Sequence, residues 1–505
     1  MSNSIKINVV WLKRDLRLSD HEPLCKAIAT GEPTALVYIF EPIVQQHPDW
    51  DIRHWQFVYH SILDLNERSE SAVQIFYGNV EEVFDCLNTH TTINQVFSHE
   101  ETGNRATFDR DIQMQKWFNS KNIKWYETPT SGVVRKLKSR KLLPKIWHSR
   151  MEAPFFEPNL DQTTFVKFDI PVRFQLPTLL KEQLLIYPAA FQPAGETFAW
   201  RYLNSFFKDR YSKYNRLISK PEASRKSCSR LSPYLAWGNL SMKQVIQATK
   251  RKSKEVGTNK VALAAFYSRL HWHCHFIQKF ESECRMEFEP VNTAYLNLEK
   301  QRIQSFIEAW QNGQTGFPLI DACMRCVKQT GYLNFRMRAM VVSFYSYNMW
   351  QPWQEGAYYL ARMFLDYEPG IHFPQFQMQT GITGINMLRI YNPIQNAIKH
   401  DPEGVFTRKW IPEIAHLPTE FVHEPWKMTD LEAEMYLFKL GENYPFPILN
   451  IEETRKYAST IMWDSKKTSE VKTENQRILK RHTHRKKESD QMTVNFDQLN
   501  NEEEI

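Results

Sequence analysis

The chain has little cysteine, and its cysteines do not form the pattern of a secreted protein. Its 505 residues include seven cysteines, scattered between positions 25 and 326. Small secreted domains that depend on disulfides concentrate an even number of cysteines in a short chain. Residues 1–6 also lack the apolar core of a signal peptide. We therefore expect free thiols and a reducing, cytoplasmic location, or a nuclear one if the source is eukaryotic.

Long apolar runs and the common metal and dinucleotide motifs are missing as well. No run of 18 apolar residues occurs, so we expect no membrane partner. The N-terminal region contains no GxGxxG loop, and no HExxH motif accompanies His271 and His275. Cys323 and Cys326 lack the further cysteines that a zinc or iron–sulfur site needs, because no cysteine follows position 326. We predict no metal site.

Aromatic residues and a weak positive charge are what the chain does have. It contains 15 tryptophans, 13% aromatic residues and a net charge of +7. Abundant aromatic rings suit a large stacked core or a site that stacks a cofactor or a base. A mild basic bias tolerates a polyanionic partner without proving one. The length exceeds one compact core and predicts two or three domains.

Residues 1–130 alternate short β-rich runs with amphipathic stretches. Strands are predicted at 7–12, 35–40, 73–77 and 93–97, and helices at 54–70, 80–88 and 105–121. Strands that alternate with helices in this way form a parallel sheet with helices on both faces. This region is therefore predicted to be an α/β domain with a doubly wound parallel sheet.

The remainder divides into three parts. Residues 131–195 are rich in proline and basic residues and are predicted to connect the domains along the surface. Residues 196–460 carry helical periodicity almost throughout, which predicts an all-α domain. From 461 to 505 hydrophobic residues thin out, and we expect a polar, disordered tail. Basic clusters at 135–141 and 480–487 are typical of solvated faces, with phosphate binding left open, more for the first.

Two local features have both a structural and a functional interpretation. The stretch 227–235 places hydroxyls and backbone donors before a predicted helix, which can hold a diphosphate through N–H groups and the helix dipole. Such a stretch is more often only a helix cap. Arg338 and Asp366 lie in separate helical segments, and an ion pair between them could equally be an ordinary structural bridge.

Several motifs resemble a known family in their order and spacing. Val10 to Asp20 reads VWLKRDLRLSD. The later motifs are FRMR at 335–338, LDYE at 365–368, RIYNP at 389–393, DPEG at 401–404, RKWIPE at 408–413 and HEPW at 423–426. Together they resemble the photolyase/cryptochrome flavoproteins, and the similarity extends from about residue 6 to about residue 428.

The resemblance implies that the all-α domain binds FAD. It assigns the FAD phosphates to Cys228, Ser229, Arg230, Leu231 and Ser232. It places Arg338 and Asp366 beside the flavin ring, where a buried cation stabilises the anionic reduced form. Arg336 and Glu368 are expected to line the same cavity, with Glu368 replacing an aspartate that is seen in many relatives.

The residues that would meet a lesion depart from the pattern of the family. Trp272 matches the tryptophan that stacks on the lesion, although packing would explain it equally well. Arg269 stands where relatives have a glutamate, Phe335 where they have an asparagine, and Met378 where they have a second stacking tryptophan. These changes alter the polarity of the cavity, so the choice between cyclobutane and (6-4) lesions stays open.

The usual chain of three tryptophans for flavin photoreduction is incomplete. Trp353 matches its middle position, but Phe376 and Lys300 occupy the flavin-proximal and outer positions. His372 matches, across a small gap, the residue that faces flavin N5. An alternative route is open through other aromatic residues, namely Trp350, Trp237, Tyr345 or Tyr347.

The resemblance implies light-driven repair, in which excited reduced FAD gives one electron to a flipped pyrimidine dimer and recovers it after the dimer splits. The partner would be UV-damaged DNA, and we expect a monomer. The alternative is a cryptochrome-like blue-light photoreceptor without repair activity, and a third hypothesis is a nucleic-acid-binding scaffold with a vestigial pocket. The Arg338 and Asp366 match argues against the third.

In relatives the N-terminal domain carries a second, light-harvesting chromophore: a folate, deazaflavin, lumazine or second flavin. Residues 99–104 of this chain lie where such a pigment would be contacted. We therefore expect an antenna chromophore there, and the sequence leaves its identity open.

Overall fold

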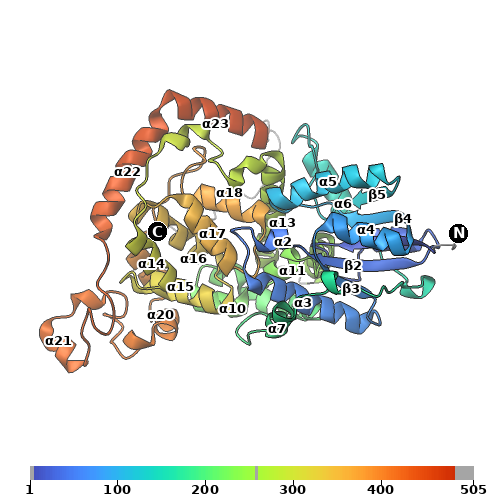
Figure 1. The fold of residues 1–505 in the computed structure, drawn as a ribbon. Helices are drawn as coiled ribbons and strands as arrows, with labels where there is room; N and C mark the ends of the chain where they lie inside the picture. Colours follow the sequence, from blue (N-terminus) through green and yellow to red (C-terminus); the bar gives the residue numbers. More distant parts are fainter. Residues whose placement is uncertain (1–4, 256–259, 484–505) are drawn as a thin grey trace.

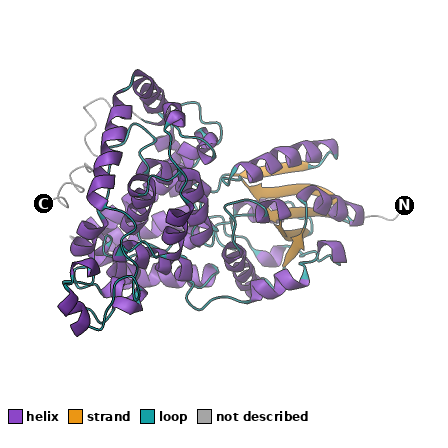
Figure 2. Cartoon of the chain, turned by 60° about the vertical axis from the view of Figure 1, so that its left-hand side comes forward, coloured by secondary structure: helices purple, strands orange, loops and turns teal. Residues whose placement is uncertain are grey.

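A five-stranded parallel sheet lies at one end of the molecule, and helices make up the rest (Figure 2). The computed structural model describes residues 5–255 and 260–483. The sheet has the order β3-β2-β1-β4-β5. Its strands are β1 (Lys6–Leu12), β2 (Thr34–Phe40), β3 (Val73–Tyr77), β4 (Thr92–His99) and β5 (Lys124–Thr128). The order reverses direction at β1, which confirms the predicted doubly wound parallel sheet.

Helices cover both faces of this sheet (Figure 1). They are α1 (Glu22–Ile28), α2 (Pro42–Gln45), α3 (Ile52–Arg68), α4 (Val80–His90) and α5 (Arg105–Ser120). Side chains alternate along β1, so Val9 and Trp11 pack in a core with α4 and α5. Val10 and Leu12 face the opposite side, where their core continues through α3 into the helical domain. One apolar core thus joins the two domains.

Helices dominate the chain beyond β5. The segment between the domains holds α6 (Leu143–Glu152) and α7 (Thr178–Leu185). The helical domain comprises α8 (Glu196–Lys208), α9 (Tyr214–Leu217), α10 (Pro221–Ser227), α11 (Ser232–Ala236), α12 (Met242–Glu255), α13 (Val261–Ser282), α14 (Gln304–Asn312), α15 (Pro318–Thr330), α16 (Phe335–Ser343), α17 (Trp353–Met363), α18 (Pro369–Gln379), α19 (Pro393–His400), α20 (Val405–Trp410) and α21 (Asp430–Met435). None of the helices within the described ranges is long and apolar enough to cross a membrane.

The C-terminal region differs from its prediction. The prediction of a disordered tail from residue 461 onward is wrong for residues 461–482. These residues belong to α22 (Ile451–Lys467) and α23 (Ser469–His482). In Figure 1 these two helices wrap the outside of the helical domain. Val471 and Ile478, seven residues apart on one face of α23, are buried in the main helical core. So few apolar positions leave a weak sequence signal, and the rest of the expected tail, 484–505, lies outside the described residues.

Three other elements also differ from the sequence prediction. Neither α1 nor β5 was predicted. The sequence signal of β5 is weak, because β5 is a short edge strand with alternating exposed positions. The helical periodicity of the all-α region does not form one continuous helix at 337–350, because α16 ends at Ser343 and a π-helical turn follows at Phe344–Asn348. A positive φ of 55° at Trp350 then reverses the chain ahead of α17.

The two domains touch closely at Gly238. This residue has a φ of +72°, and a Cβ atom there would lie 2.1 Å from the carbonyl oxygen of Arg14. Arg17 Nη1 donates to the Gly238 carbonyl at 3.0 Å, and Leu16 N donates to the Trp237 carbonyl at 3.2 Å. The backbones of the two domains therefore meet without an intervening side chain.

We predict that Gly238→Ala destabilises the protein more than Gly31→Ala does. Both positions have positive φ, so each alanine costs about 1–2 kcal/mol of backbone strain. Gly31 has no atom within 4 Å of its added Cβ, whereas Gly238 faces fixed backbone. We expect Gly238→Ala to cost at least about 2 kcal/mol more in urea unfolding. Equal losses in the two variants would show that the domain junction can shift.

Candidate functional site

The Arg338 and Asp366 side chains form a bidentate ion pair. Arg338 Nη2 donates to Asp366 Oδ1 and Oδ2 at 2.9 and 2.8 Å, and its Nε donates to the Leu333 carbonyl at 2.9 Å. The guanidinium also stacks over the Phe364 ring at 3.8 Å. Asp366 is almost fully buried. The pair therefore holds a cation in a fixed orientation between α16 and the end of α17.

Tyr332 joins this pair to the stretch 227–232. The Arg230 guanidinium lies 3.6 Å from the centre of the Tyr332 ring, and that of Arg338 lies 5.9 Å from it. Tyr332 itself is buried. The sequence analysis missed Tyr332, because nothing in the sequence separates it from an ordinary core aromatic residue.

The stretch 227–232 has the features of an anion-binding loop. Arg230 adopts a left-handed backbone conformation with a φ of 60°, and its carbonyl accepts from Gln192 Nε2 at 2.6 Å. Ser227 Oγ and Arg230 Nε are buried without a hydrogen-bond partner among the described residues. Buried donors of this kind require an acceptor. The loop thus fits a ligand that carries phosphate oxygens.

The helix after this loop is short. It begins at Ser232 and ends at Ala236. A helix of one turn has only a small dipole, because the macrodipole sums over aligned peptides. Any diphosphate would therefore be held by the donors of the loop, including Ser227 and Arg230, more than by the helix end.

Glu368 meets an arginine from the N-terminal domain. Its Oε2 lies 3.4 Å from Arg14 Nη1, which also donates to the carbonyls of Tyr367 and Ala236. Burial raises the pKa of Glu368 to about 7, although Arg14 opposes the change. An open pocket at the domain junction is lined by Arg14, Glu368 and His273, among others. Glu368 thus lies at this junction.

His372 begins a short series of aromatic rings. Its Nε2 donates to the Ala357 carbonyl at 2.8 Å, and burial lowers its pKa to about 4, so the ring is neutral near pH 7. The His372 ring centre is 5.9 Å from that of Phe376, which is 6.4 Å from that of Trp353. The structure therefore brings these three residues together.

Lys300 occupies a polar site beside two aromatic rings. Its Nζ donates to Ser346 Oγ at 2.8 Å and lies 4.5 Å from the centre of the Trp350 ring. Burial lowers the pKa of Lys300 to about 7. Trp350 also contacts Tyr457 of α22, with ring centres 5.4 Å apart. A route through Trp350 stays a prediction.

Trp272, Arg269 and Phe335 form an exposed group on α13 and α16. Trp272 is 36% exposed and Phe335 is 41% exposed. The Arg269 guanidinium lies 5.7 Å from the centre of the Phe335 ring. Arg269 and Trp272 are three residues apart and therefore lie on one face of α13. A cation and two apolar rings thus face solvent together.

Arg336 lies on a different face of α16 from Arg338. Residues two positions apart on a helix do not share a face. The Arg336 guanidinium lies 5.9 Å from the centre of the Tyr391 ring. That Arg336 lines the flavin cavity stays a prediction.

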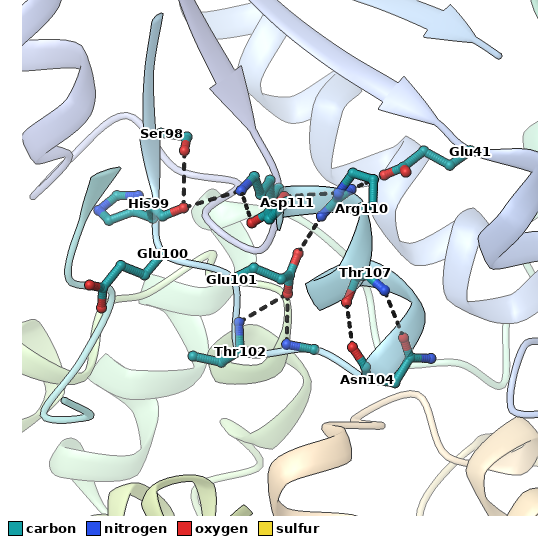
Figure 3. A network of polar contacts seen from close by, with 12 residues as sticks. Glu41, Ser98, His99, Glu100, Glu101, Thr102, Asn104, Thr107, Arg110 and Asp111 are labelled. Carbon is teal, nitrogen blue, oxygen red and sulfur yellow. Dashed lines mark hydrogen bonds and ion pairs between the residues drawn. The ribbon is translucent and has the colours of Figure 1, made fainter. Parts of the chain in front are cut away.

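A larger pocket lies between the carboxyl ends of the strands and the helical domain. Aromatic side chains line much of it, among them Trp11, Tyr38, Trp50, Trp55 and Trp237. Of the predicted segment 99–104, Glu101, Gly103 and Asn104 contribute to the lining. Glu101 accepts from Arg110 Nη2 at 2.8 Å (Figure 3). It also accepts from the backbone N–H of Gly103 at 2.7 Å. The loop is therefore held by charged side chains.

His47 bridges the domains next to this cavity. Its Nδ1 lies 2.8 Å from Asp49 Oδ1, and its Nε2 lies 3.2 Å from Glu287 Oε1 in the helical domain. Tyr367 OH donates to Asp49 Oδ2 at 2.5 Å. Although burial lowers it, the hydrogen bonds to Asp49 and Glu287 raise the pKa of His47 to about 9. The two carboxylates lie on opposite ring nitrogens, which suits an imidazolium that donates to both.

Comparison with known proteins agrees with this arrangement. Residues 8–140 match the family model described as DNA photolyase, and residues 266–464 match the FAD binding domain of DNA photolyase. A deoxyribodipyrimidine photo-lyase of Alkalihalophilus pseudofirmus is 26% identical, covering 91% of this chain and 98% of its own length. A cryptochrome DASH of Synechocystis is 27% identical over 88% of this chain and 96% of its own. An archaeal photolyase structure from Sulfolobus tokodaii with two FAD molecules has a TM-score of 0.73 at 23% identity, covering 91% of this chain and 99% of its own.

The fold and the site define a two-domain flavoprotein with an FAD-binding helical domain. The chain belongs to the photolyase/cryptochrome family.

The His47 bridge predicts a loss of stability at alkaline pH. A histidine whose pKa rises from about 6.5 to about 9 on folding contributes fully below pH 6.5, and its contribution disappears as the pH rises through 9. We expect the free energy of unfolding to fall by about 2 kcal/mol over this range, measured by urea denaturation. His47→Gln should remove that slope. His416→Gln, a change of an exposed histidine, should retain it; a slope that persists in His47→Gln would contradict the bridge.

Proposed function

We propose that this protein repairs UV-induced pyrimidine dimers in DNA by light-driven, FAD-dependent electron transfer, as a deoxyribodipyrimidine photolyase-type lyase. The observation that carries the proposal is the fixed Arg338–Asp366 pair, joined through Tyr332 to a loop with unpartnered buried donors. The partner is UV-damaged DNA, and the protein acts as a cytoplasmic monomer.

Different residues of the helical domain would hold different parts of the cofactor. Ser227, Ser229 and Arg230 would hold the phosphates, together with the backbone of Cys228, Leu231 and Ser232. Arg338 would lie beside the flavin ring, oriented by Asp366, and His372 would face the ring as a neutral group. Glu368 would close the site toward Arg14. Bound FAD in its reduced form supplies one electron when it absorbs light.

The exposed group on α13 and α16 would receive the damaged bases. A flipped dimer can stack on Trp272, since an aromatic face is indifferent to the identity of the base. Arg269 offers donors to carbonyl oxygens of the lesion, where a glutamate would offer only acceptors. This chain therefore favours a lesion with exposed carbonyl acceptors.

A second candidate function is that of a cryptochrome-like blue-light photoreceptor without repair activity. The specific observation in its favour is the changed set of lesion contacts, since Arg269 and Phe335 stand where relatives have a glutamate and an asparagine. The relatives of this chain include both photolyases and cryptochromes.

A second chromophore would bind in the larger pocket beside the sheet. Its aromatic walls suit a planar ring system. The related archaeal structure holds two FAD molecules. The cavity would act as a light-harvesting antenna.

Arg338→Ala should reduce FAD retention by tenfold or more. The variant leaves Asp366 buried and unpaired, and its charge would then repel the anionic reduced flavin. The measurement is the flavin-to-protein absorbance ratio after gel filtration, with photoreduction followed at pH 7. Arg302→Ala removes an exposed bidentate pair with Glu355 and should change neither. Full occupancy with unaltered photoreduction in Arg338→Ala would refute the assignment.

Repair itself is tested with cyclobutane and (6-4) dimers under blue light. Trp272→Ala should weaken binding of every lesion by about 1–3 kcal/mol through lost stacking. Arg269→Glu should change which lesion is bound or repaired, because it replaces a donor by an acceptor. If the purified flavoprotein neither repairs DNA in light nor prefers irradiated DNA, the photoreceptor function replaces the repair proposal.

A further inference from the structure

A cluster of four basic side chains lies beside Trp272 and has no assigned role. Its members are Arg140 from the segment between the domains, His275 and Lys279 from α13, and His482 from the end of α23. Arg140 Nη1 donates to His275 Nδ1 at 3.3 Å. The charges of Arg140 and Lys279 both act on His275 and His482. Burial lowers the pKa of both histidines, so these three segments bring two cations and two neutral imidazoles together.

The donors of this cluster are buried and unused. Arg140 Nε and Nη2 have no hydrogen-bond partner within residues 5–255 and 260–483, and neither does His482 Nδ1, which is an acceptor because His482 Nε2 donates to Glu283. His482 is 2% exposed and Lys279 is 6% exposed. Burial alone lowers the pKa of Arg140 to about 10, with no carboxylate opposing the change. An arginine that is desolvated in this way is costly unless an anion accompanies it.

The nearest carboxylate is already engaged. Glu283 accepts from Arg285 at 2.6 Å and from Arg477 at 2.8 Å, and lies 2.5 Å from His482 Nε2. Two arginines therefore compensate its single negative charge. Glu283 also acts on Lys279, but no carboxylate of the described residues raises the pKa of Arg140, which leaves the cluster short of an anion.

The neighbouring Trp272 indicates which class of anion would complete the cluster. Its exposed ring lies 5.1 Å from that of His275, the residue that accepts from Arg140. A cationic site next to an exposed aromatic ring is the arrangement with which proteins hold a nucleic acid strand, since the ring stacks a base and the cations meet its phosphate. Exposed basic residues, including Lys141 and Arg481, surround the cluster.

We propose that Arg140, His275, Lys279 and His482 form a binding site for a backbone phosphate of the nucleic acid strand whose base stacks on Trp272. This inference rests on the proposed function for the stacked base, while the site itself requires only an oxyanion. Its fourth member comes from α23, which lies beyond residues 266–464, the part that matches the FAD-binding family model. In Figure 1 the end of α23 points toward the N-terminal domain, where the connecting segment lies.

The test uses the full-length flavoprotein and its Arg140→Gln variant, with Lys141→Gln as the control. Both changes remove one positive charge from adjacent residues, but Lys141 is exposed. Binding of a fluorescent irradiated oligonucleotide is measured by anisotropy across a salt series. Arg140→Gln should weaken binding about tenfold and reduce the slope of log K against log[salt] by about one. Lys141→Gln should weaken binding less than about threefold.

Thermal unfolding in inorganic phosphate distinguishes binding of a free oxyanion from binding of a DNA phosphate. Phosphate should raise the Tm of the wild type above that seen with chloride at equal ionic strength, and Arg140→Gln should abolish this gain. Without phosphate, Arg140→Gln should unfold at the same or a higher temperature, because it removes a repelled, desolvated cation. Lys279→Met provides an independent variant with the same expectations if Arg140→Gln fails to fold.

The outcomes distinguish this site from the proposed function. If phosphate protects the wild type but DNA affinity is the same in Arg140→Gln and Lys141→Gln, the site binds a free oxyanion and the proposal for DNA is wrong. If neither phosphate protection nor the change in salt slope occurs, the site itself is refuted, even where repair is observed. A third outcome is that Arg140→Gln loses both the phosphate protection and the expected part of the salt slope, while the wild type shows no repair activity. That outcome would support the phosphate site and reject the repair function.

Discussion

Arg14 is the contact on which the candidate site most depends. It comes from the N-terminal domain, yet it donates to the carbonyls of Ala236 and Tyr367 and pairs with Glu368. Its guanidinium also lies 4.4 Å from the centre of the Trp237 ring. One side chain thus links the end of α11, the helix after the stretch 227–232, to the acidic turn at 365–368 that carries Asp366. Because Arg14 is largely buried, these contacts are shielded from water and salt.

The domain junction is therefore part of the site and not a passive hinge. The core of one sheet face continues into the helical domain, and Gly238 allows the backbones to meet. The Tyr367 hydroxyl reaches Asp49, which also holds His47. The acidic turn next to Arg338 is consequently positioned from both domains. Both cavities lie along this junction, so the relative placement of the domains determines the shape of each.

The C-terminal helices on the outer side of the molecule are likewise attached by contacts between segments that lie far apart in the chain. Glu283 at the end of α13 collects Arg285, Arg477 and His482, and so attaches α23 to the helix that carries Trp272. Asn292 reinforces the attachment by donating to the Val471 carbonyl at 3.2 Å. The position of the exposed tryptophan is thus coupled to a segment that appeared from its composition to be a polar tail.

The sequence by itself determined the α/β and all-α parts of the fold, four of the five strands and the main helices, and its motifs predicted the residues of the flavin site. These follow from local patterns, since strand and helix periodicities and short motifs are written in neighbouring residues. Only the tertiary structure decided that Arg338 pairs with Asp366, that Tyr332 joins them to Arg230, and that Glu368 faces Arg14. It also decided that residues 469–482 form a docked helix. Such contacts join residues tens to hundreds of positions apart, and their energies come from burial and charge pairing that no local pattern records.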